Sequence, residues 1–414
     1  MEGKAIVMKV IYIHQYFKTP EEGGAIRSYH LARGLVEAGV DVEMVTAHNS
    51  KQYDFRLVDG IRVHYLPVFY DNTFGVFRRA ASFLRFVRQA KSLIKKLHRA
   101  ELLYITSTPL TVGWIGLWAK KRFAVPYIFE VRDLWPEAPI QLGVIRNKLI
   151  QKSLYHLEER IYRHALKVVA LSPGIKNYIS AKIPQTNPVL IPNFSDTRFF
   201  LPKRKDVRVM EKLGLKDKFT IAYTGAMGPV NSLHDFLGLA KEAQNQSKDW
   251  QFLLMGAGKK EDELKQIAGS LALKNVHFYP YGNKWKVYEL LTAADMAYIS
   301  FDHVPVLRTN SPNKFFDAIS MGKAILINQK GWVENLVKEH QLGLYHTYKN
   351  HGKTVLQLEE FVAHPSKLKD AQKNARNLAV SHFSKERAIE LLLFTLDPVK
   401  FKLDSTDGVY TLTA

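Results

Sequence analysis

Residues 311–327 read SPNKFFDAISMGKAILI, and this stretch carries the clearest signal of the fold. It predicts a short amphipathic helix that leads into a β-branched strand, AILI, at residues 324–327. Ser311 is expected to cap the helix, and Pro312 suits its first position, where no N–H is needed. A helix followed at once by such a strand is the repeating unit of an α/β protein.

The same alternation extends along the chain. Segments with helical periodicity, such as Ile26–Glu37 and residues 146–165, separate short β-branched and aromatic runs, which predicts parallel sheets covered by helices on both faces. IRVHYLPV at residues 61–68 is the exception, because it follows Asp59-Gly60 and is typical of a hairpin arm. The expected strands are VMKVIYIHQYF, VDVEMVTA, LLYITS, PYIFEV and KVVALS in the first half, and FTIAYTG, WQFLLMGAG, VHFYPY, MAYIS and AILIN in the second.

Residues 194–217 interrupt this rhythm, since they are polar, charged and poor in strand signals. They are typical of a linker with one short helix. We therefore predict two βα domains, residues 1–195 and 196–383, that face each other across a cleft and bind ligands where their strands end. Residues 384–414 are expected to form a helix and a tail, with the helix packing back toward the first domain.

Composition narrows the classes of partner. The 414 residues suit two domains, and they include 59 Lys and Arg, 39 Asp and Glu, a net charge of +20 and no Cys. The lack of Cys excludes disulfides, thiolate metal sites and thiol catalysis, and it fits a cytoplasmic location. The basic excess favours polyanions. Because no nucleic-acid-binding signature is present, we rank anionic lipid and nucleotide phosphates above nucleic acid. No apolar run suits a secretory signal or a membrane span.

The start of this predicted helix, at residues 311–314, has the features of an anion site. Free N–H groups, the helix dipole and Lys314 would together attract a phosphate. Asp317 lies one turn further on and would accept hydrogen bonds from the vicinal hydroxyls of a sugar. These are the elements of a nucleotide-sugar site, although a capped surface helix with a charged face is the alternative interpretation.

Several ordered motifs together resemble family 4 of the retaining glycosyltransferases. The resemblance implies a GT-B fold, in which two Rossmann-like domains face each other and the second holds most of the donor. The variants EVRDLWPE, TGAMG and SPNKFFD are most similar to a bacterial subgroup that transfers N-acetylated amino sugars, of the L-fucosamine type, from UDP in surface polysaccharide synthesis. The motifs are HQYF and EEGGAIRSYHLARGLVEAGVDVEMVT near the start, PYIFEVRDLWPE at 126–137, VVALSPGIKNYI at 168–179, VLIPNFSDTRFF at 189–200, YTGAMGPVNSL at 223–233, FLLMGAG at 252–258 and SPNKFFDAISMGKAILI at 311–327.

The resemblance assigns a donor site. Family members commonly clamp the diphosphate with an Arg and a Lys at positions occupied here by Ala226 and Asn231, so Arg308 and Lys314 are the expected replacement cations. The paired-glutamate pattern of the family corresponds to Thr309 and Asp317; because Thr309 cannot act as a carboxylate, Asn310 or backbone groups would recognise the sugar. The expected donor-binding residues are Gly23, Gly24, Gly225, Met227, Gly228, Tyr281, Arg308, Asn310, Ser311, Asn313, Lys314 and Asp317, whereas Gly256 and Gly258 are expected to form a turn beneath the nucleotide site.

Catalytic candidates lie in Glu130-Val131-Arg132-Asp133. Many relatives have a His at the position of Arg132, close to the reactive carbon, and an Arg there would stabilise the leaving diphosphate. Asp133 or Glu130 would orient the acceptor or the sugar. The alternative is a buried Arg–carboxylate network at a strand end.

Three more side chains come from the same reading of the N-terminal half. His14 is a secondary candidate for contacting the acceptor. In the next helix, Arg27 would reach a phosphate, and His30 is expected to pack in the core.

A basic segment covers residues 74–100, which include eight Lys or Arg and no acid. Phe77, Leu84, Val87, Ile94 and Leu97 recur at helical spacing. One face would pack on the domain, while the basic remainder and Phe74, Phe83 and Phe86 would meet an anionic membrane surface. A solvated basic face is the alternative.

The sequence thus favours a retaining enzyme that moves a sugar from a UDP-sugar to a glycan or a polyprenyl-diphosphate-linked acceptor at the cytoplasmic face of the membrane. Neither an Asp-x-Asp pair nor His residues at ligand spacing are present, so we expect a metal-independent enzyme without a cofactor other than its donor. Two alternatives stay open: an epimerase or hydrolase of the same fold, and a non-catalytic, membrane-peripheral assembly protein.

Overall fold

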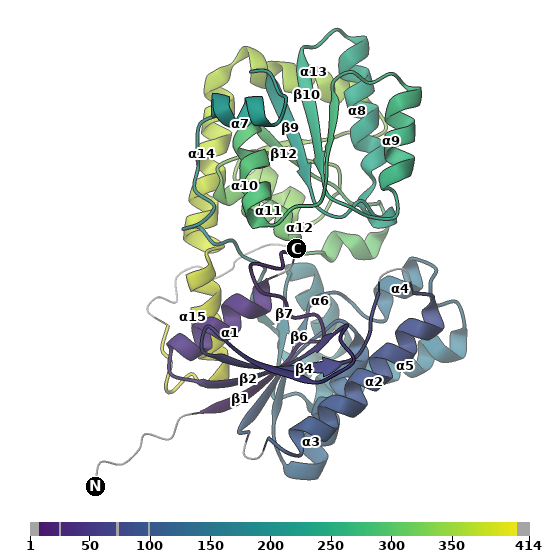
Figure 1. Cartoon of the computed structure of the whole chain (residues 1–414), viewed down its shortest axis with the longest axis vertical. Coiled ribbons are helices and arrows are strands. Elements are labelled where there is room, and N and C mark those ends of the chain that lie inside the picture. Colours follow the sequence, from purple (N-terminus) through teal and green to yellow (C-terminus); the bar gives the residue numbers. More distant parts are fainter. Residues whose placement is uncertain (1–7, 25, 72–73, 98–99, 404–414) are drawn as a thin grey trace.

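The computed structural model describes residues 8–24, 26–71, 74–97 and 100–403, which form two lobes (Figure 1). The sheet of the N-terminal lobe has the order β3-β4-β2-β1-β5-β6-β7-β8 and is parallel except for the β3–β4 hairpin. Its strands are β1 (Lys9–Ile13), β2 (Asp41–His48), β3 (Asp54–Val58), β4 (Ile61–Pro67), β5 (Leu102–Thr106), β6 (Tyr127–Val131), β7 (Lys167–Ala170) and β8 (Val189–Leu190). The hairpin predicted around Asp59-Gly60 is confirmed, with Gly60 at φ +82° in the turn.

Helices cover both faces of this sheet, so its central strands are buried on both sides. On one face Ile11, Ile13 and Ile105 contact the helices that follow β4, β5 and β6, and on the other Tyr12 and Tyr104 lie under α1. This two-sided burial explains the nearly continuous apolar runs of the sequence. The helices are α1 (Arg27–Glu37), α2 (Val76–Ile94), α3 (Gly113–Phe123), α4 (Glu137–Gln141), α5 (Lys148–His164) and α6 (Pro173–Lys182), with short 3-10 turns η1 (Leu110–Val112) and η2 (Pro184–Thr186).

The C-terminal lobe repeats the design with a fully parallel sheet in the order β11-β10-β9-β12-β13-β14. Its strands are β9 (Phe219–Thr224), β10 (Trp250–Met255), β11 (Val276–Tyr279), β12 (Met296–Ile299), β13 (Ala324–Ile327) and β14 (Gly343–Tyr345). Its helices are α8 (Leu233–Asn245), α9 (Glu261–Ser270), α10 (Lys284–Ala293), α11 (Asn313–Ser320), α12 (Trp332–Glu339), α13 (His351–Ala363) and α14 (Pro365–His382), with 3-10 turns η3 (Pro229–Asn231) and η4 (Pro305–Thr309). The predicted linker has its single short helix, α7 (Val207–Lys212).

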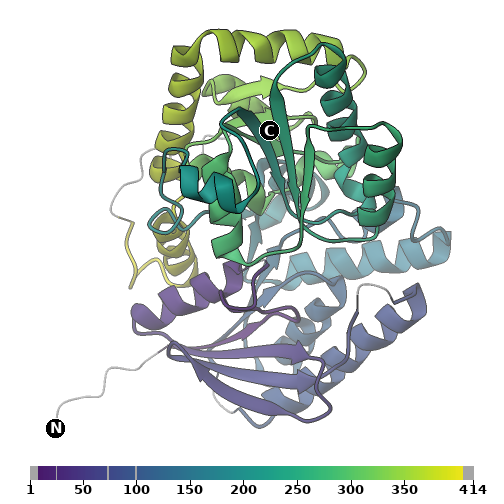
Figure 2. The ribbon, with the colours of Figure 1, turned by 45° about the horizontal axis from the view of Figure 1, so that its top comes forward.

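The last helix returns to the N-terminal lobe. After α14, α15 (Lys385–Leu396) lies against α1, and Leu391 and Leu392 complete the core under that helix. Figure 2 shows α14 and α15 running down one side of the molecule across both lobes. A Cβ on Gly34 of α1 would lie 2.6 Å from Ile389, so this glycine sets how closely the two helices approach. The expected tail beyond residue 403 lies outside the described residues.

The lobes meet along the carboxyl edges of their sheets. The segment after β12 crosses to the N-terminal lobe, where the Val306 N–H donates to Gln141 Oε1 at 2.9 Å and Ser172 Oγ donates to the Thr309 carbonyl at 2.5 Å. Ligands of doubly wound sheets bind at this edge. The start of α11 therefore lies where a site between the lobes is expected.

Candidate active site

The start of α11 differs from the predicted cap. Pro312, with ψ of 120°, is the residue before the helix, and its predecessor Ser311 makes no capping bond. The reason is tertiary: Ser311 Oγ accepts from the Asn193 N–H at 3.1 Å, and the Ser311 carbonyl accepts from Asn193 Nδ2 at 2.5 Å. Ser311 thus joins the two lobes by hydrogen bonds, and its predicted role as a helix cap is wrong.

Lys314 lies one residue inside the helix and points at the end of β9. Its Nζ donates to the Tyr223 hydroxyl at 2.8 Å and lies 4.1 Å from the centroid of that ring. A Cβ on Gly225, which has φ of +143°, would lie 3.2 Å from the Lys314 side chain. Burial lowers the pKa of Lys314 to about 7. Among the described residues no carboxylate forms an ion pair with it, so an anion bound here would restore the charged form.

Asp317 lies on the same side of α11, three residues after Lys314. Ser195 Oγ donates to its Oδ1 at 3.3 Å. Burial raises the pKa of Asp317 to about 7, so the carboxyl group changes charge near neutral pH. We call Tyr223, Gly225, Lys314 and Asp317 the α11 cluster.

In the Gly225–Gly228 turn, the N–H groups of Gly225, Met227 and Gly228, three of the expected donor-binding residues, are not free to bind a diphosphate. The Gly225 N–H donates to the Met255 carbonyl, the Met227 N–H donates to the Ala257 carbonyl, and the Gly228 N–H donates to Asn231 Oδ1. Direct binding through the N–H groups of Gly225, Met227 and Gly228 is therefore wrong. Asn231, at the position where relatives carry a Lys, holds the turn instead.

The turn rests on a second glycine loop. A Cβ on Gly256 would lie 1.8 Å from the Gly225 carbonyl oxygen, and one on Gly258 would lie 2.4 Å from the Met227 carbonyl oxygen. The two loops thus pack backbone to backbone. Gly256 and Gly258 thus form a turn as expected, and its place beneath a nucleotide site stays a prediction.

The Gly23-Gly24 loop meets the opposite lobe at Tyr281. Both glycines have positive φ, +70° and +87°, and a Cβ on Gly23 would lie 3.0 Å from the Tyr281 hydroxyl. Tyr281 itself is 56% exposed. The structure thus brings together, from two lobes, the loop and the tyrosine that the sequence proposed for the donor.

Glu130 is not accessible to any substrate. It is fully buried, and its oxygens accept from Arg27 Nη2 at 2.9 Å, the Tyr104 hydroxyl at 2.7 Å and Thr106 Oγ1 at 2.6 Å. Burial acts to raise the pKa of Glu130, but the charges of Arg27 and Arg132 outweigh it, so the pKa is lowered. The catalytic assignment of Glu130 is wrong, and so is the phosphate-binding assignment of Arg27, since this pair is the buried Arg–carboxylate network that the sequence left as the alternative.

Arg132 and Asp133 lie at the same strand edge but outside this network. The side-chain Nη1 of Arg132 lies 3.3 Å from His14 Nε2, and the backbone N–H of Arg132 donates to Ser107 Oγ at 3.0 Å. Burial, and then the charge of Arg132, lower the pKa of His14 well below its ordinary value, so His14 is neutral and Nε2 is the acceptor. Burial raises the pKa of Asp133 against the opposing effect of Arg132. We call His14, Arg132 and Asp133 the Arg132 cluster.

Two family models match the sequence. "Glycosyl transferase 4-like domain" matches residues 22–193, and "Glycosyl transferases group 1" matches residues 208–378. The chain belongs to the family 4 glycosyltransferases. No curated protein matches the sequence.

Solved structures show that this glycosyltransferase has the GT-B fold. Sucrose-phosphate synthase from Thermosynechococcus elongatus aligns with a TM-score of 0.78 at 16% identity, over 95% of this chain and 99% of that one. HepE from Anabaena, in complex with UDP-glucose, aligns with a TM-score of 0.68 at 17% identity, over 94% and 100%. WaaG, a glycosyltransferase involved in lipopolysaccharide biosynthesis, aligns with a TM-score of 0.63 at 16% identity, over 93% and 99%.

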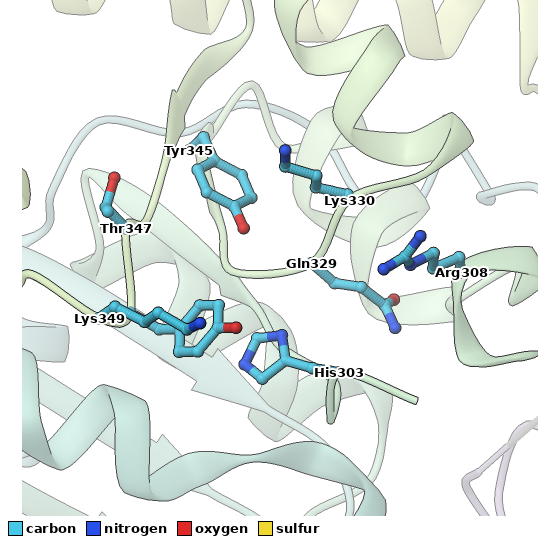
Figure 3. A pocket seen from close by; sticks show the side chains of 8 residues that line it. His303, Arg308, Gln329, Lys330, Tyr345, Thr347 and Lys349 are labelled. Carbon is cyan, nitrogen blue, oxygen red and sulfur yellow. The ribbon is translucent and has the colours of Figure 1, made fainter. Parts of the chain in front are cut away.

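The remaining predicted residues of the glycosyltransferase are not part of the α11 cluster. Arg308 lines a separate pocket with His303, Lys330 and Tyr345 (Figure 3), so the structure does not place it as a replacement cation beside Lys314. The Asn310 carbonyl accepts from Trp332 Nε1 at 2.7 Å. Further residues fall as follows: the Thr309 side chain packs on Gly174 of the N-terminal lobe, and Asn313 is the partly buried first residue of α11.

Some site residues have no strong sequence signal. Asn193 and Ser195 hold the start of α11 from the other lobe, and they lie in VLIPNFSD, part of one of the motifs that carry the family resemblance. In the described part of the chain, the buried Gln15 side chain has no hydrogen-bond partner for either of its polar atoms, and neither does His14 Nδ1. Such unpartnered buried groups are rare in native proteins.

No group of three or more His, Cys, Asp or Glu side chains within the described ranges is arranged to hold a metal ion. Likewise, no helix in those ranges is long and apolar enough to cross a membrane.

Proposed function

We propose that this glycosyltransferase binds a nucleoside diphosphate sugar on the α11 cluster and transfers the sugar with retention of configuration, without a metal ion. The observation that carries this proposal is Lys314, a partly buried cation that has a single hydroxyl partner and no counter-ion among the described residues. A diphosphate would supply the negative charge that Lys314 lacks as a partner. The complex of HepE with UDP-glucose supports a nucleotide-sugar donor, because the two chains share the fold.

The donor would span the interface between the lobes. Lys314 would contact the diphosphate, and the ionised Asp317 would accept from the ribose hydroxyls. Tyr281, opposite Gly23, would lie beside the base. The Gly225 turn would shape the wall of the site, because its glycine leaves room for the Lys314 side chain.

The transfer would exchange one carbon–oxygen bond for another. The acceptor hydroxyl attacks the anomeric carbon on the face from which the diphosphate departs, and its proton passes to the departing phosphate oxygen. Arg132, held by His14 and Ser107, would stabilise the charge that develops on the leaving group. Asp133 would orient the acceptor or the sugar.

We further propose that the donor is a UDP-linked N-acetylated amino sugar and that the acceptor is a glycan or a polyprenyl-diphosphate-linked sugar of a surface polysaccharide. The motifs EVRDLWPE, TGAMG and SPNKFFD support the sugar class. The similarity in fold to WaaG, involved in lipopolysaccharide biosynthesis, is consistent with the pathway class.

A membrane surface is the proposed partner of α2. This helix packs on its lobe through Phe86, Val87, Ala90 and Ile94. The sequence-based prediction that Phe86 meets the membrane is therefore wrong, because its side chain is buried. Phe77 is 92% exposed and Leu84 is 52% exposed. The exposed basic residues around them are Arg78, Arg85, Arg88, Lys95 and Lys96. Apolar side chains within a basic helix face suit an anionic membrane surface at the cytoplasmic side.

The test of the donor proposal is calorimetric titration of the full chain with UDP, GDP and ADP and with their N-acetylhexosamine conjugates. We expect binding of UDP species and its loss in Lys314→Met. An acceptor screen with the binding sugar then follows, with analysis of the anomeric product. Product formation without acceptor would favour the epimerase or hydrolase, and donor binding without turnover on any acceptor would favour the assembly protein. Equal affinity of Lys314→Met and the unchanged protein for UDP would refute the assignment of the α11 cluster.

A further inference from the structure

A second site candidate opens at the carboxyl ends of β12, β13 and β14. Its volume is about 390 Å³, within the range of small-molecule sites. Figure 3 shows side chains from four segments that converge on it. They are His303, Arg308, Gln329, Lys330, Tyr345, Thr347, Tyr348 and Lys349, which we call the basic pocket.

The pocket concentrates positive charge. Arg308, Lys330 and Lys349 are exposed, and among the described residues none of the three forms an ion pair. This contrasts with many lysines of the same lobe, such as Lys248, which pairs with Glu359 at 2.5 Å. None of the residues that line the pocket carries a carboxylate. Three acids lie around it: Glu334 lines an adjoining small cavity together with Arg308 and Lys330, Asp235 contacts His303, and the Asp302 carboxylate accepts from the His303 backbone N–H.

The walls supply neutral groups that suit an oxyanion. Tyr345, Thr347 and Tyr348 contribute hydroxyls, which donate readily to phosphate oxygens. His303 stacks on Tyr348 with ring centroids 3.5 Å apart and an angle of 17° between the planes, so these two rings form a flat wall. Asp235 Oδ2 accepts from His303 Nε2 at 3.3 Å and fixes that imidazole. An Arg fork, two Lys point charges and hydroxyls together are typical of phosphate recognition.

The basic pocket is separate from the α11 cluster. Lys314 contacts Tyr223 at the end of β9, whereas the pocket is built from β12, β13 and β14 and from η4. Arg308 belongs to η4, the turn whose neighbours Val306 and Thr309 bond to the N-terminal lobe. A ligand in the pocket would therefore contact the segment that joins the lobes.

We propose that the basic pocket binds the phosphoryl group of a second ligand, either a phosphomonoester or a diphosphate, while the donor occupies the α11 cluster. The same group could belong to a soluble molecule or to a lipid headgroup. The inference does not depend on the identity of the donor, since it rests on residues outside the α11 cluster.

The test is calorimetric titration of the full chain with inorganic pyrophosphate in the presence of saturating UDP. The Lys330→Gln/Lys349→Gln variant is expected to bind pyrophosphate at least 10-fold more weakly. The matched control is Lys369→Gln/Lys373→Gln, which removes the same charge from exposed positions of α14 and is expected to leave the affinity unchanged. Thermal unfolding checks that both variants fold. Equal pyrophosphate affinity in the unchanged protein and in the pocket variant would overturn the proposal.

Two further measurements distinguish the basic pocket from the α11 cluster, and a soluble ligand from a lipid headgroup. Lys314→Met is expected to lose UDP binding and to retain pyrophosphate binding at the pocket, so a failure of the donor assignment is seen independently. Vesicles of phosphatidylcholine with phosphatidic acid are sedimented with each protein. Weaker sedimentation of the pocket variant than of the α14 control would support a lipid headgroup. Equal sedimentation with a pyrophosphate difference would support a soluble ligand. Equal pyrophosphate affinity refutes the pocket whatever the sedimentation result.

Discussion

Arg27 and Lys314 are both cations removed from bulk water at the carboxyl edge of a sheet, yet their surroundings differ. Arg27 donates to Glu130 through two nitrogens and to the Ile191 and Pro192 carbonyls. Lys314 has one hydroxyl acceptor, Tyr223. A cation with a complete set of partners belongs to the scaffold, whereas one without a counter-ion is prepared for a ligand. The comparison makes opposite predictions for stability and for binding.

The largest expected effect follows from breaking the complete pair. Arg27→Met leaves Glu130 buried without its cation, so we expect the free energy of unfolding to fall by about 3–5 kcal/mol. Urea denaturation measures it. The matched control is Arg27→Met/Glu130→Gln, which removes both charges and should recover part of the loss. A loss below 1 kcal/mol for the single variant would contradict the scaffold role.

Lys314→Met is expected to weaken UDP binding without lowering stability, in contrast to Arg27→Met. Because the charge lacks a counter-ion, the free energy of unfolding at pH 7 should stay the same or rise. The affinity for UDP should fall by about 1.5–3 kcal/mol, the range for hydrogen bonds to charged groups. Calorimetry and urea denaturation on the same preparation give both values. A stability loss as large as that of Arg27→Met would show that Lys314 is also scaffold.

The pKa of Lys314 predicts a pH dependence. Its folded value, about 7, is below the ordinary value of 10.5, so between these limits the unfolded chain binds more protons and stability rises with pH. From pH 7 to pH 8.5 the free energy of unfolding of the unchanged protein, relative to Lys314→Met, should rise by about 1.5 kcal/mol. Denaturation of both proteins at each pH isolates this group. A flat difference would mean that Lys314 titrates normally.

The contribution of Asp317 to the free energy of unfolding changes with pH in the opposite direction to that of Lys314. Its folded pKa, about 7, is above the ordinary value of 3.8, so the protonated folded form is favoured and stability from this group falls as pH rises from 4 to 7.

The smallest expected effect is on donor affinity. Asp317→Asn should weaken UDP binding about five-fold, or about 1 kcal/mol, because the amide retains one acceptor for the ribose. The control is UDP affinity of Ser195→Ala, which removes the hydroxyl that contacts Asp317 but leaves the carboxylate. Unchanged affinity in Asp317→Asn and Asp317→Ala would exclude the ribose contact.

The sequence predicted the architecture well, because periodicity is a local property. Alternating apolar runs and helical segments marked both parallel sheets, the hairpin at Asp59-Gly60 and the short helix α7 in the linker. The motif order identified the family. Lys314 and Asp317 could be proposed because a helix start and one turn of spacing are visible in sequence, and their role in donor binding stays a prediction.

The tertiary structure decided which polar residues are already paired within the protein. Ser311 lost its predicted capping role to Asn193, which is 118 residues away, and Glu130 is satisfied by Arg27, which is 103 residues away. Arg308 lies in the basic pocket because η4 turns it toward β13 and β14. Sequence determines what an element can form, since its propensities act over a few residues. Whether a charge is paired depends on segments that only folding brings together, because hydrogen bonds and desolvation depend on distance in space.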